Sequence, residues 1–185
     1  MTLNQAVVVL WLGSEVVIAV THAAPFSLRG QDRRSGLALV GFLALGVIAG
    51  MYVARKVPGA GIAEGRTFAY DLGIALALAG IALRWWAVLT LGRFFTTRVV
   101  TRAGQTVVEN GPYRLVRHPS YTGALLTVLG VLLSATNWLS LACFLIALPG
   151  FAYRIKVEED ALRAGLGQPY QEYMRRTKRL VPFVV

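Results

Sequence analysis

The feature that most constrains this chain is a series of apolar runs, each long enough to cross a lipid bilayer. About 20 apolar residues in a helix span a ~30 Å hydrocarbon core. Hydrophobic residues make up 56% of the 185-residue chain, whose mean hydropathy is +0.57. We therefore predict an all-α integral membrane protein with about five transmembrane helices in one domain, residues 1–185. The expected spans are residues 6–24, 36–54, 68–91, 119–135 and 137–153.

The placement of basic residues predicts how these spans are oriented. The segments 25–35, 92–118 and 154–185 contain three, five and seven of the 19 Lys and Arg residues, whereas 55–67 contains three. By the positive-inside rule, loop 92–118 and the tail 154–185 lie in the cytoplasm and the N-terminus lies outside. We expect a multi-pass protein of a bacterial or archaeal inner membrane. Because the basic residues lie between apolar runs, the net charge of +10 does not indicate a nucleic-acid partner.

The last two spans are joined by a very short connection. Only residues 134–137 separate them, which forces an antiparallel helical hairpin. The hairpin returns the chain to the side where the span 119–135 begins. Beyond it, Pro169 follows two glycines and predicts the start of a helix in the C-terminal tail. Two polar segments, one before the hairpin and one after it, are thus expected to meet.

The first polar segment precedes the fourth span and reads Gly-Pro-Tyr-Arg-Leu-Val-Arg-His-Pro-Ser-Tyr-Thr-Gly at residues 111–123. Pro119 lacks an N–H group but suits the first turn of a helix, so the helix is expected to begin there with His118 at its cap. The positive end of that helix would face the surroundings of Arg117, His118 and Tyr121. It favours an anionic group such as a carboxylate or a phosphate.

The second polar segment follows the hairpin and contains Arg154, Glu158, Glu159, Tyr170 and Tyr173. Taken alone, Arg154 and Glu158 could form an ordinary surface ion pair, since they lie four residues apart on a helix. The two tyrosines could simply pack at the membrane interface. A functional interpretation is favoured because the hairpin brings a cation, acids, a histidine and tyrosines together beside the membrane.

Three ionisable residues lie within or at the ends of predicted spans. Glu15 and His22 belong to the first span, and Arg84 belongs to the third. Such residues are functional candidates at membrane depth, but Glu15 could instead pair with a neighbouring helix and Arg84 could extend to the headgroups. In the second span, the spacing of Gly46 and Gly50 predicts close helix packing.

Together, the two polar segments resemble the isoprenylcysteine carboxyl methyltransferase family. The likeness covers about residues 80–183 and consists of Arg-His-Pro-x-Tyr-x-Gly followed, in order, by Glu-Glu-x-x-Leu, Gly-x-x-Tyr-x-x-Tyr and Leu-x-Pro. It implies a membrane methyltransferase that uses S-adenosylmethionine and releases S-adenosylhomocysteine. It further implies that Arg154 positions the acceptor carboxylate and that Glu158 takes part in catalysis. The implied cofactor-binding residues are Tyr113, Arg117, His118, Pro119, Tyr121, Glu159, Tyr170 and Tyr173.

The methyl acceptor stays open at this point. An isoprenylcysteine-like carboxylate needs an arginine to orient it and no general base, whereas a phosphatidylethanolamine-type amine would need Glu158 or a tyrosine to remove a proton. The expected partners are membrane lipids and a lipophilic small-molecule or prenylated acceptor. A non-catalytic membrane binding module would explain the spans but not the ordered motifs. The single cysteine, Cys143, lies in an apolar run, so we predict packing for it and no metal site.

Overall fold

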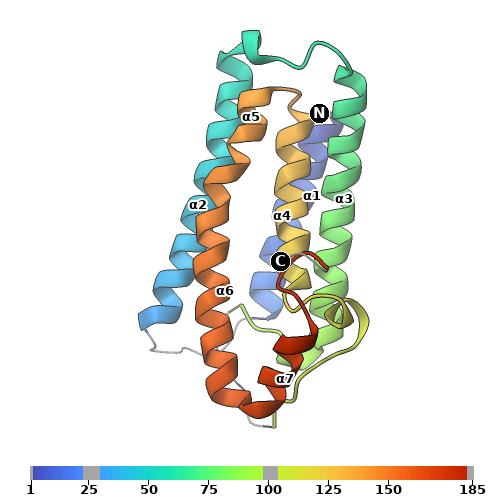
Figure 1. Ribbon diagram of the computed structural model, residues 1–185. Helices are drawn as coiled ribbons and strands as arrows, with labels where there is room; N and C mark the ends of the chain where they lie inside the picture. Colours follow the sequence, from blue (N-terminus) through green and yellow to red (C-terminus); the bar gives the residue numbers. More distant parts are fainter. Residues whose placement is uncertain (1, 23–29, 98–103, 183–185) are drawn as a thin grey trace.

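The computed structural model describes residues 2–22, 30–97 and 104–182, and within these ranges the chain is a bundle of helices with no named strand (Figure 1). The predicted all-α class is confirmed. The helices are α1 Leu3–Thr21, α2 Gly30–Lys56, α3 Arg66–Leu91, α4 Pro119–Ser134, α5 Trp138–Ala142, α6 Phe144–Leu166 and α7 Gln168–Arg176, with 3-10 turns η1 Pro58–Ala60, η2 Gly92–Phe94 and η3 Gly111–Arg114.

Most of the bundle has the length and apolarity of membrane-crossing helices. In the described part of the chain these segments are Leu3–Thr21, Asp32–Lys56, Arg66–Phe94 and Trp138–Leu166. Helix α4 is shorter, with 16 residues, and lies along α3. Large apolar side chains stay exposed on the outside, such as Val16 at 62% and Ile48 at 67%, where lipid can cover them. The chain is therefore a multi-pass membrane protein.

The hairpin is present, but its second arm is longer than the sequence predicts. Helix α5 gives way to α6 at Cys143, and α6 then continues to Leu166, so that residues 154–166 of the expected tail are helical. The apolar run ends near Tyr153, but the helix continues beyond it. The helix ends only where the backbone leaves the helical conformation, at Gly167 with φ 62°. Helix α7 then begins at Gln168 with a proline in its first turn, as expected.

The first span also begins earlier than its apolar run. Thr2 accepts a hydrogen bond from the backbone of Gln5, whose side chain bonds back to the backbone of Thr2. This capping box starts α1 at Leu3, three residues before the predicted boundary. Residues 23 and 24, the predicted end of that span, lie outside the described residues.

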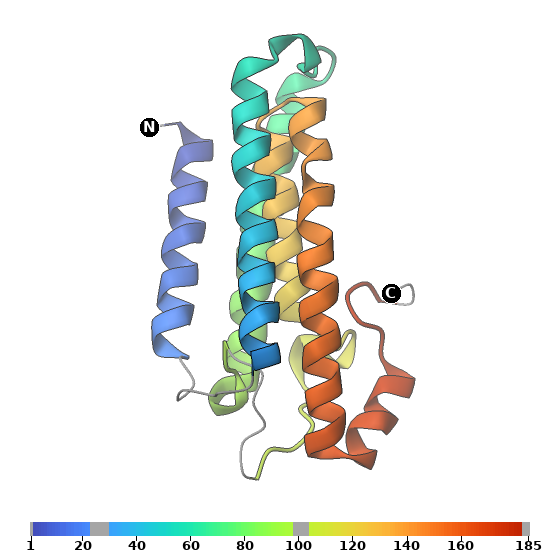
Figure 2. The same cartoon turned by 90° about the vertical axis from the view of Figure 1, so that its left-hand side faces the viewer.

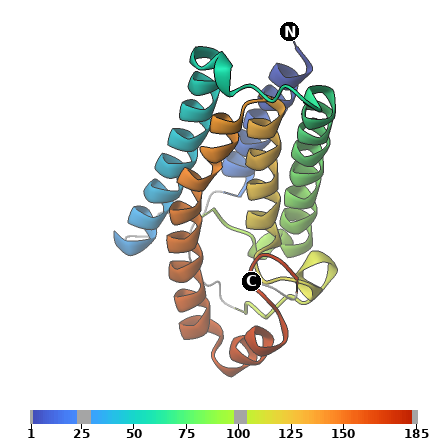
Figure 3. The same cartoon turned by 45° about the horizontal axis from the view of Figure 1, so that its top comes forward.

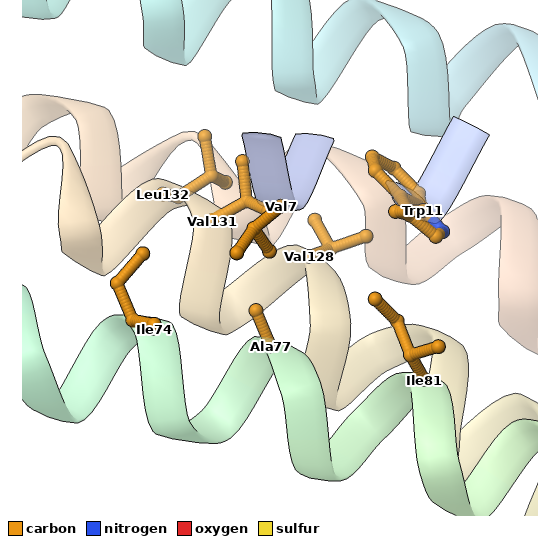
Figure 4. Packing of buried hydrophobic residues seen from close by; sticks show 8 residues of the cluster. All are labelled: Val7, Trp11, Ile74, Ala77, Ile81, Val128, Val131 and Leu132. Atoms are coloured by element: carbon orange, nitrogen blue, oxygen red, sulfur yellow. The ribbon is translucent and has the colours of Figure 1, made fainter. Parts of the chain in front are cut away.

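The helices pack mainly as two pairs. Helix α4 lies along α3, and α6 lies along α2, while α1 lies on the outside against α3 and α4 (Figures 1 and 2). An apolar cluster fastens α1 to the α3–α4 pair (Figure 4). Its buried members are Val7, Trp11, Ile74, Ala77, Ile81, Val128, Val131 and Leu132.

Glycines on both helices allow the close contact between α3 and α4. A Cβ on Gly130 would lie 2.4 Å from the backbone nitrogen of Ala77 and 2.5 Å from the carbonyl oxygen of Gly73. Seven residues earlier on α4, a Cβ on Gly123 would lie 2.7 Å from the carbonyl oxygen of Gly80 on α3. The backbone cannot yield as a flexible side chain can. A larger residue at these positions must therefore separate the helices.

Different segments of the chain lie at the two ends of the bundle. The N-terminus, the α2–α3 connection and the turn between α4 and α5 lie at one end (Figure 3). The start of α4, the end of α6 and α7 lie at the other end, together with η2 and η3 (Figure 1). The two polar segments of the sequence are therefore adjacent in space.

We predict that Gly130→Ala weakens the fold. Overpacking of this kind costs about 1–3 kcal/mol, because the methyl group would push against the α3 backbone. Thermal unfolding of the detergent-solubilised protein should show a lower midpoint. Gly41→Ala is the control, since a Cβ at Gly41 would meet nothing within 4 Å. Equal midpoints for the two variants would contradict the close approach of α3 and α4.

Candidate active site

A cavity of about 340 Å³ lies at the end of the bundle where the two polar segments meet. Its walls come from all the long helices, from residues 95–97 and 105–108 between η2 and η3, and from α7. One part is polar, and the part between α1, α2 and α6 is apolar. The polar part includes Tyr113, His118, Tyr121, Arg154, Glu158 and Tyr170, and the apolar part includes Trp11, Leu39, Val40, Leu43, Ala124 and Phe151.

The start of α4 places His118 and Tyr121 in the cavity wall. Pro119 occupies the first turn of α4, and His118 is its N-cap residue, as the sequence predicts. The rings of His118 and Tyr121 are stacked with centroids 5.6 Å apart, and Phe151 meets Tyr121 edge-on at 5.9 Å. Pro119 itself does not line the cavity, so its contribution is to begin the helix.

Glu159 is the buried centre of a charged network. Its side chain is 1% exposed, and Oε1 accepts a hydrogen bond from Nε of Arg117 at 3.0 Å and lies 3.3 Å from Nε2 of His118. Oε2 accepts a hydrogen bond from Nη2 of Arg179 at 3.0 Å. Glu159 is not among the cavity-lining residues. Both oxygens of Glu159 are engaged behind the cavity wall, and the contact of Glu159 with the cofactor stays a prediction.

Arg117 lines the cavity, but its guanidinium is also occupied. Besides the bond to Glu159, Nη1 donates to the carbonyl oxygen of Met174 at 3.1 Å and to that of Thr177. The backbone of Arg117 donates to the carbonyl oxygen of Lys178 at 2.7 Å. These bonds fasten the segment after α7 to the start of α4. Arg117 thus holds these two segments together at the edge of the cavity.

Arg154 is held by residues that the sequence analysis did not select. It is 4% exposed, and Nη1 donates to Oδ1 of Asp32 at 2.7 Å and to Oγ of Ser35 at 2.9 Å. Nη2 donates to the carbonyl oxygen of Thr97 at 2.9 Å. The alternative of a surface ion pair with Glu158 is wrong, since the ion pair of Arg154 is formed with Asp32 across the bundle. Arg154 also lines the cavity, where it interacts with Tyr121.

Glu158 is the carboxylate that lines the cavity. Its Oε2 accepts a hydrogen bond of 2.5 Å from the hydroxyl of Tyr121. Consecutive residues of a helix differ in direction by about 100°, so Glu158 and Glu159 face different surroundings. The motif places both glutamates in the site region, but the helix gives only Glu158 to the cavity.

Three buried tyrosines close the polar part of the cavity. Tyr113 belongs to η3, and Tyr170 and Tyr173 belong to α7. The hydroxyl of Tyr173 donates to the carbonyl oxygen of Tyr113 at 2.7 Å, whereas the buried hydroxyl of Tyr170 has no hydrogen-bond partner among the described residues. Burial is the largest cause that raises the pKa of all three, and nearby carboxylates raise it further. They therefore stay neutral hydroxyl groups at physiological pH.

A second charged cluster joins α1, α3 and α4 at the cavity wall. Arg84 donates through Nη2 to Oε2 of Glu15 at 2.6 Å and through Nη1 to Oγ of Ser120 at 2.9 Å. Glu15 thus pairs with a neighbouring helix, as one alternative predicted, and Arg84 extends into the protein rather than to the headgroups. His22 lies outside the cavity, edge-on to Phe95 at 5.3 Å.

The structure brings together eight of the ten predicted site residues in one cavity wall, with Pro119 and Glu159 behind it. Among the residues that it describes, no group of three or more His, Cys, Asp or Glu could hold a metal ion. Sequence reasoning missed the residues that hold the predicted ones in place. These are Asp32, Ser35, Ser120 and Arg179.

Known proteins resemble this chain in sequence and in fold. The model of the isoprenylcysteine carboxyl methyltransferase family matches residues 73–164. A probable protein-S-isoprenylcysteine O-methyltransferase of Oryza sativa subsp. japonica is 34% identical over 120 residues, which cover 63% of each chain. Protein-S-isoprenylcysteine O-methyltransferase B of Arabidopsis thaliana is 35% identical over 117 residues, covering 62% of this chain and 59% of that protein. The chain thus spans less than two thirds of these relatives.

A solved structure extends the likeness to most of the fold. It is the structure of a eukaryotic intramembrane Ras methyltransferase, an isoprenylcysteine carboxyl methyltransferase. The match has a TM-score of 0.60 and covers 85% of this chain and 55% of that one, at 23% sequence identity. At this identity the match indicates a shared fold and no more.

We predict that removing the hydroxyl group lowers stability at one of two neighbouring tyrosines and not at the other. Tyr173→Phe removes a buried hydrogen bond and should lower the free energy of unfolding by about 1 kcal/mol. Tyr170→Phe removes a hydroxyl that has no partner and should cost nothing in the ligand-free protein. Chemical or thermal unfolding in detergent measures both. A similar loss in the two variants would contradict the hydrogen-bond assignment.

Proposed function

The chain belongs, through residues 73–164, to the isoprenylcysteine carboxyl methyltransferase family, and on that basis we propose that it is an S-adenosylmethionine-dependent membrane methyltransferase. Its acceptor is a lipophilic molecule with an isoprenylcysteine-like carboxylate. The observation that carries this proposal is the division of one cavity into a polar part, made by the family motifs, and an apolar part between membrane helices. A charged donor and a lipid-like acceptor need such a combination.

The polar part suits S-adenosylmethionine, which supplies, when bound, a methyl group on a sulfonium centre. The unpartnered hydroxyl of Tyr170 is a buried polar atom that a ligand can satisfy. The aromatic rings of Tyr113, His118 and Tyr121 suit adenine and a sulfonium cation. Glu158 can accept from the cofactor's ammonium, since it is the carboxylate in the wall. Glu159 and Arg117 support this arrangement by holding His118 and the segment after α7.

Arg154 orients the acceptor in this proposal. Its guanidinium is fixed by Asp32, Ser35 and the backbone of Thr97, so its orientation in the cavity wall is set. A carboxylate bound there is already a nucleophile. The protein then contributes proximity, alignment and exclusion of water, and needs no general base. The apolar part of the cavity, between α1 and α2, accommodates the hydrocarbon portion of the acceptor.

Glu158 keeps one alternative open for test. A carboxylate that faces the cavity could take a proton from an amine, as a phospholipid N-methyltransferase would require.

The proposal also includes the orientation of the protein in the membrane. The end of the bundle that carries the motifs faces the cytoplasm, because most basic residues lie at that end. A bacterial or archaeal inner membrane stays a prediction.

We predict that S-adenosylhomocysteine binds saturably to the detergent-purified protein, as measured by isothermal titration calorimetry. Tyr170→Phe should weaken binding about fivefold, which corresponds to one lost hydrogen bond of ~1 kcal/mol. Tyr153→Phe is the control, because Tyr153 lies on α6 but does not line the cavity. No binding to the well-folded wild-type protein would contradict the enzyme proposal and favour a non-catalytic membrane module.

We predict methyl transfer to an S-farnesylcysteine derivative, assayed with radiolabelled S-adenosylmethionine. A methyl ester releases volatile methanol in alkali, and an N-methyl group does not. Arg154→Gln should lower kcat by about 100-fold or more, because the acceptor is no longer aligned, while S-adenosylhomocysteine binding reports that the variant is folded. Glu158→Gln should leave kcat independent of pH, because a carboxylate acceptor needs no general base. Alkali-stable methylation of phosphatidylethanolamine, lost in Glu158→Gln, would overturn the carboxylate assignment.

A further inference from the structure

A second groove lies at the end of the bundle opposite the candidate active site. Its volume is about 460 Å³, and it is lined by the start of α1, the end of α2, the start of α3 and the end of α4. These four helix ends lie at the same end of the bundle (Figure 3). The groove is therefore placed where transmembrane helices leave the hydrocarbon core and meet lipid headgroups. Its polar lining includes Asn4, Arg55, Arg66, Thr67, Tyr70 and Thr136.

The charge of this groove is one-sided. Arg55 from α2 and Arg66 from α3 line it, and no aspartate or glutamate does. Neither guanidinium has an ion pair or a side-chain hydrogen bond with a described residue. Helix α3 also begins here, at Arg66, and its N-cap residue Gly65 provides no side-chain cap, so the positive end of a helix adds to the charge. Two arginines that line one groove without an acidic partner suit a phosphate group.

The groove also offers a hydrogen-bond acceptor and apolar borders. Oδ1 of Asn4 is buried and has no partner among the described residues, so a hydroxyl donor of a ligand would satisfy it. Phe68 and Leu3, next to lining residues in sequence, are 71% and 57% exposed. Such side chains can contact acyl chains that descend along the bundle. A soluble phosphate would gain nothing from them.

We propose that this groove binds the headgroup of an anionic glycerophospholipid that carries hydroxyl donors, as phosphatidylglycerol does. The phosphate lies between Arg55 and Arg66, and a headgroup hydroxyl donates to Asn4. Because the groove is made by four helix ends, an occupied groove helps to hold α1 to the rest of the bundle. Among the described helices, α1 packs mainly against α3 and α4. This site is independent of methyl transfer.

Native mass spectrometry of the full chain with added phosphatidylglycerol or phosphatidylcholine tests the proposal. The wild type should retain one phosphatidylglycerol molecule in preference to phosphatidylcholine and should gain thermal stability from it. Arg55→Gln and Arg66→Gln should each weaken retention about tenfold, the size expected for a charge-assisted hydrogen bond. Lys56→Gln is the matched control, since Lys56 is an exposed neighbour of Arg55 that does not line the groove.

Each outcome decides for or against the site. Loss in both arginine variants, with Lys56→Gln unchanged, supports it, as does an Asn4→Leu variant that no longer distinguishes phosphatidylglycerol from phosphatidic acid. Equal retention of phosphatidylcholine, or an equal loss in Lys56→Gln, overturns it, because binding would then reflect hydrophobic contact or overall charge. Displacement of the lipid by millimolar inorganic phosphate, with no change in acyl contacts, would reassign the groove to a soluble anion.

Discussion

The candidate site depends above all on one buried carboxylate, that of Glu159. A charge at 1% exposure is tolerated only where it is paired, and loss of one partner of such a group typically costs about 3–5 kcal/mol. Its partners come from two separate parts of the chain: Arg117 and His118 before α4, and Arg179 after α7. Pairing them with one residue of α6 fixes the loop, the helix start and the C-terminal segment relative to one another. The cavity wall is built on that arrangement.

The same physical rule connects the helix pairs. Arg154 of α6 is neutralised by Asp32 of α2, and Arg84 of α3 by Glu15 of α1. Both arginines line the cavity, and each is paired with a carboxylate that does not belong to the family motifs. These two carboxylates lie outside residues 73–164, the part that matches the family. The first third of the chain, which carries no motif, thus supplies the counter-charges that allow arginines to lie at membrane depth.

Much of the fold was predictable because the bilayer imposes a simple requirement on length and apolarity. The helices, the hairpin and the start of α4 at Pro119 follow from local sequence. Helix pairing did not follow from it. Gly46 and Gly50 show the spacing expected for close packing, whereas Gly73, Gly80, Gly123 and Gly130 repeat every seven residues on two different helices. Their meaning is visible only when α3 and α4 are placed side by side.

The site was predictable as a set of residues but not as a set of roles. A motif indicates which residues occur together at a site of a given chemistry. The role of each residue depends on the direction in which its side chain points, and neighbouring residues on a helix point about 100° apart. Glu158 and Glu159 are equivalent in composition and in the motif, yet one accepts a hydrogen bond from Tyr121 in the cavity and the other is enclosed by arginines. The choice between them is made by Arg117 and Arg179, which lie 42 and 20 residues away in sequence. A carboxylate surrounded by fixed cations holds structure; a carboxylate beside a tyrosine in an open cavity is available to a ligand.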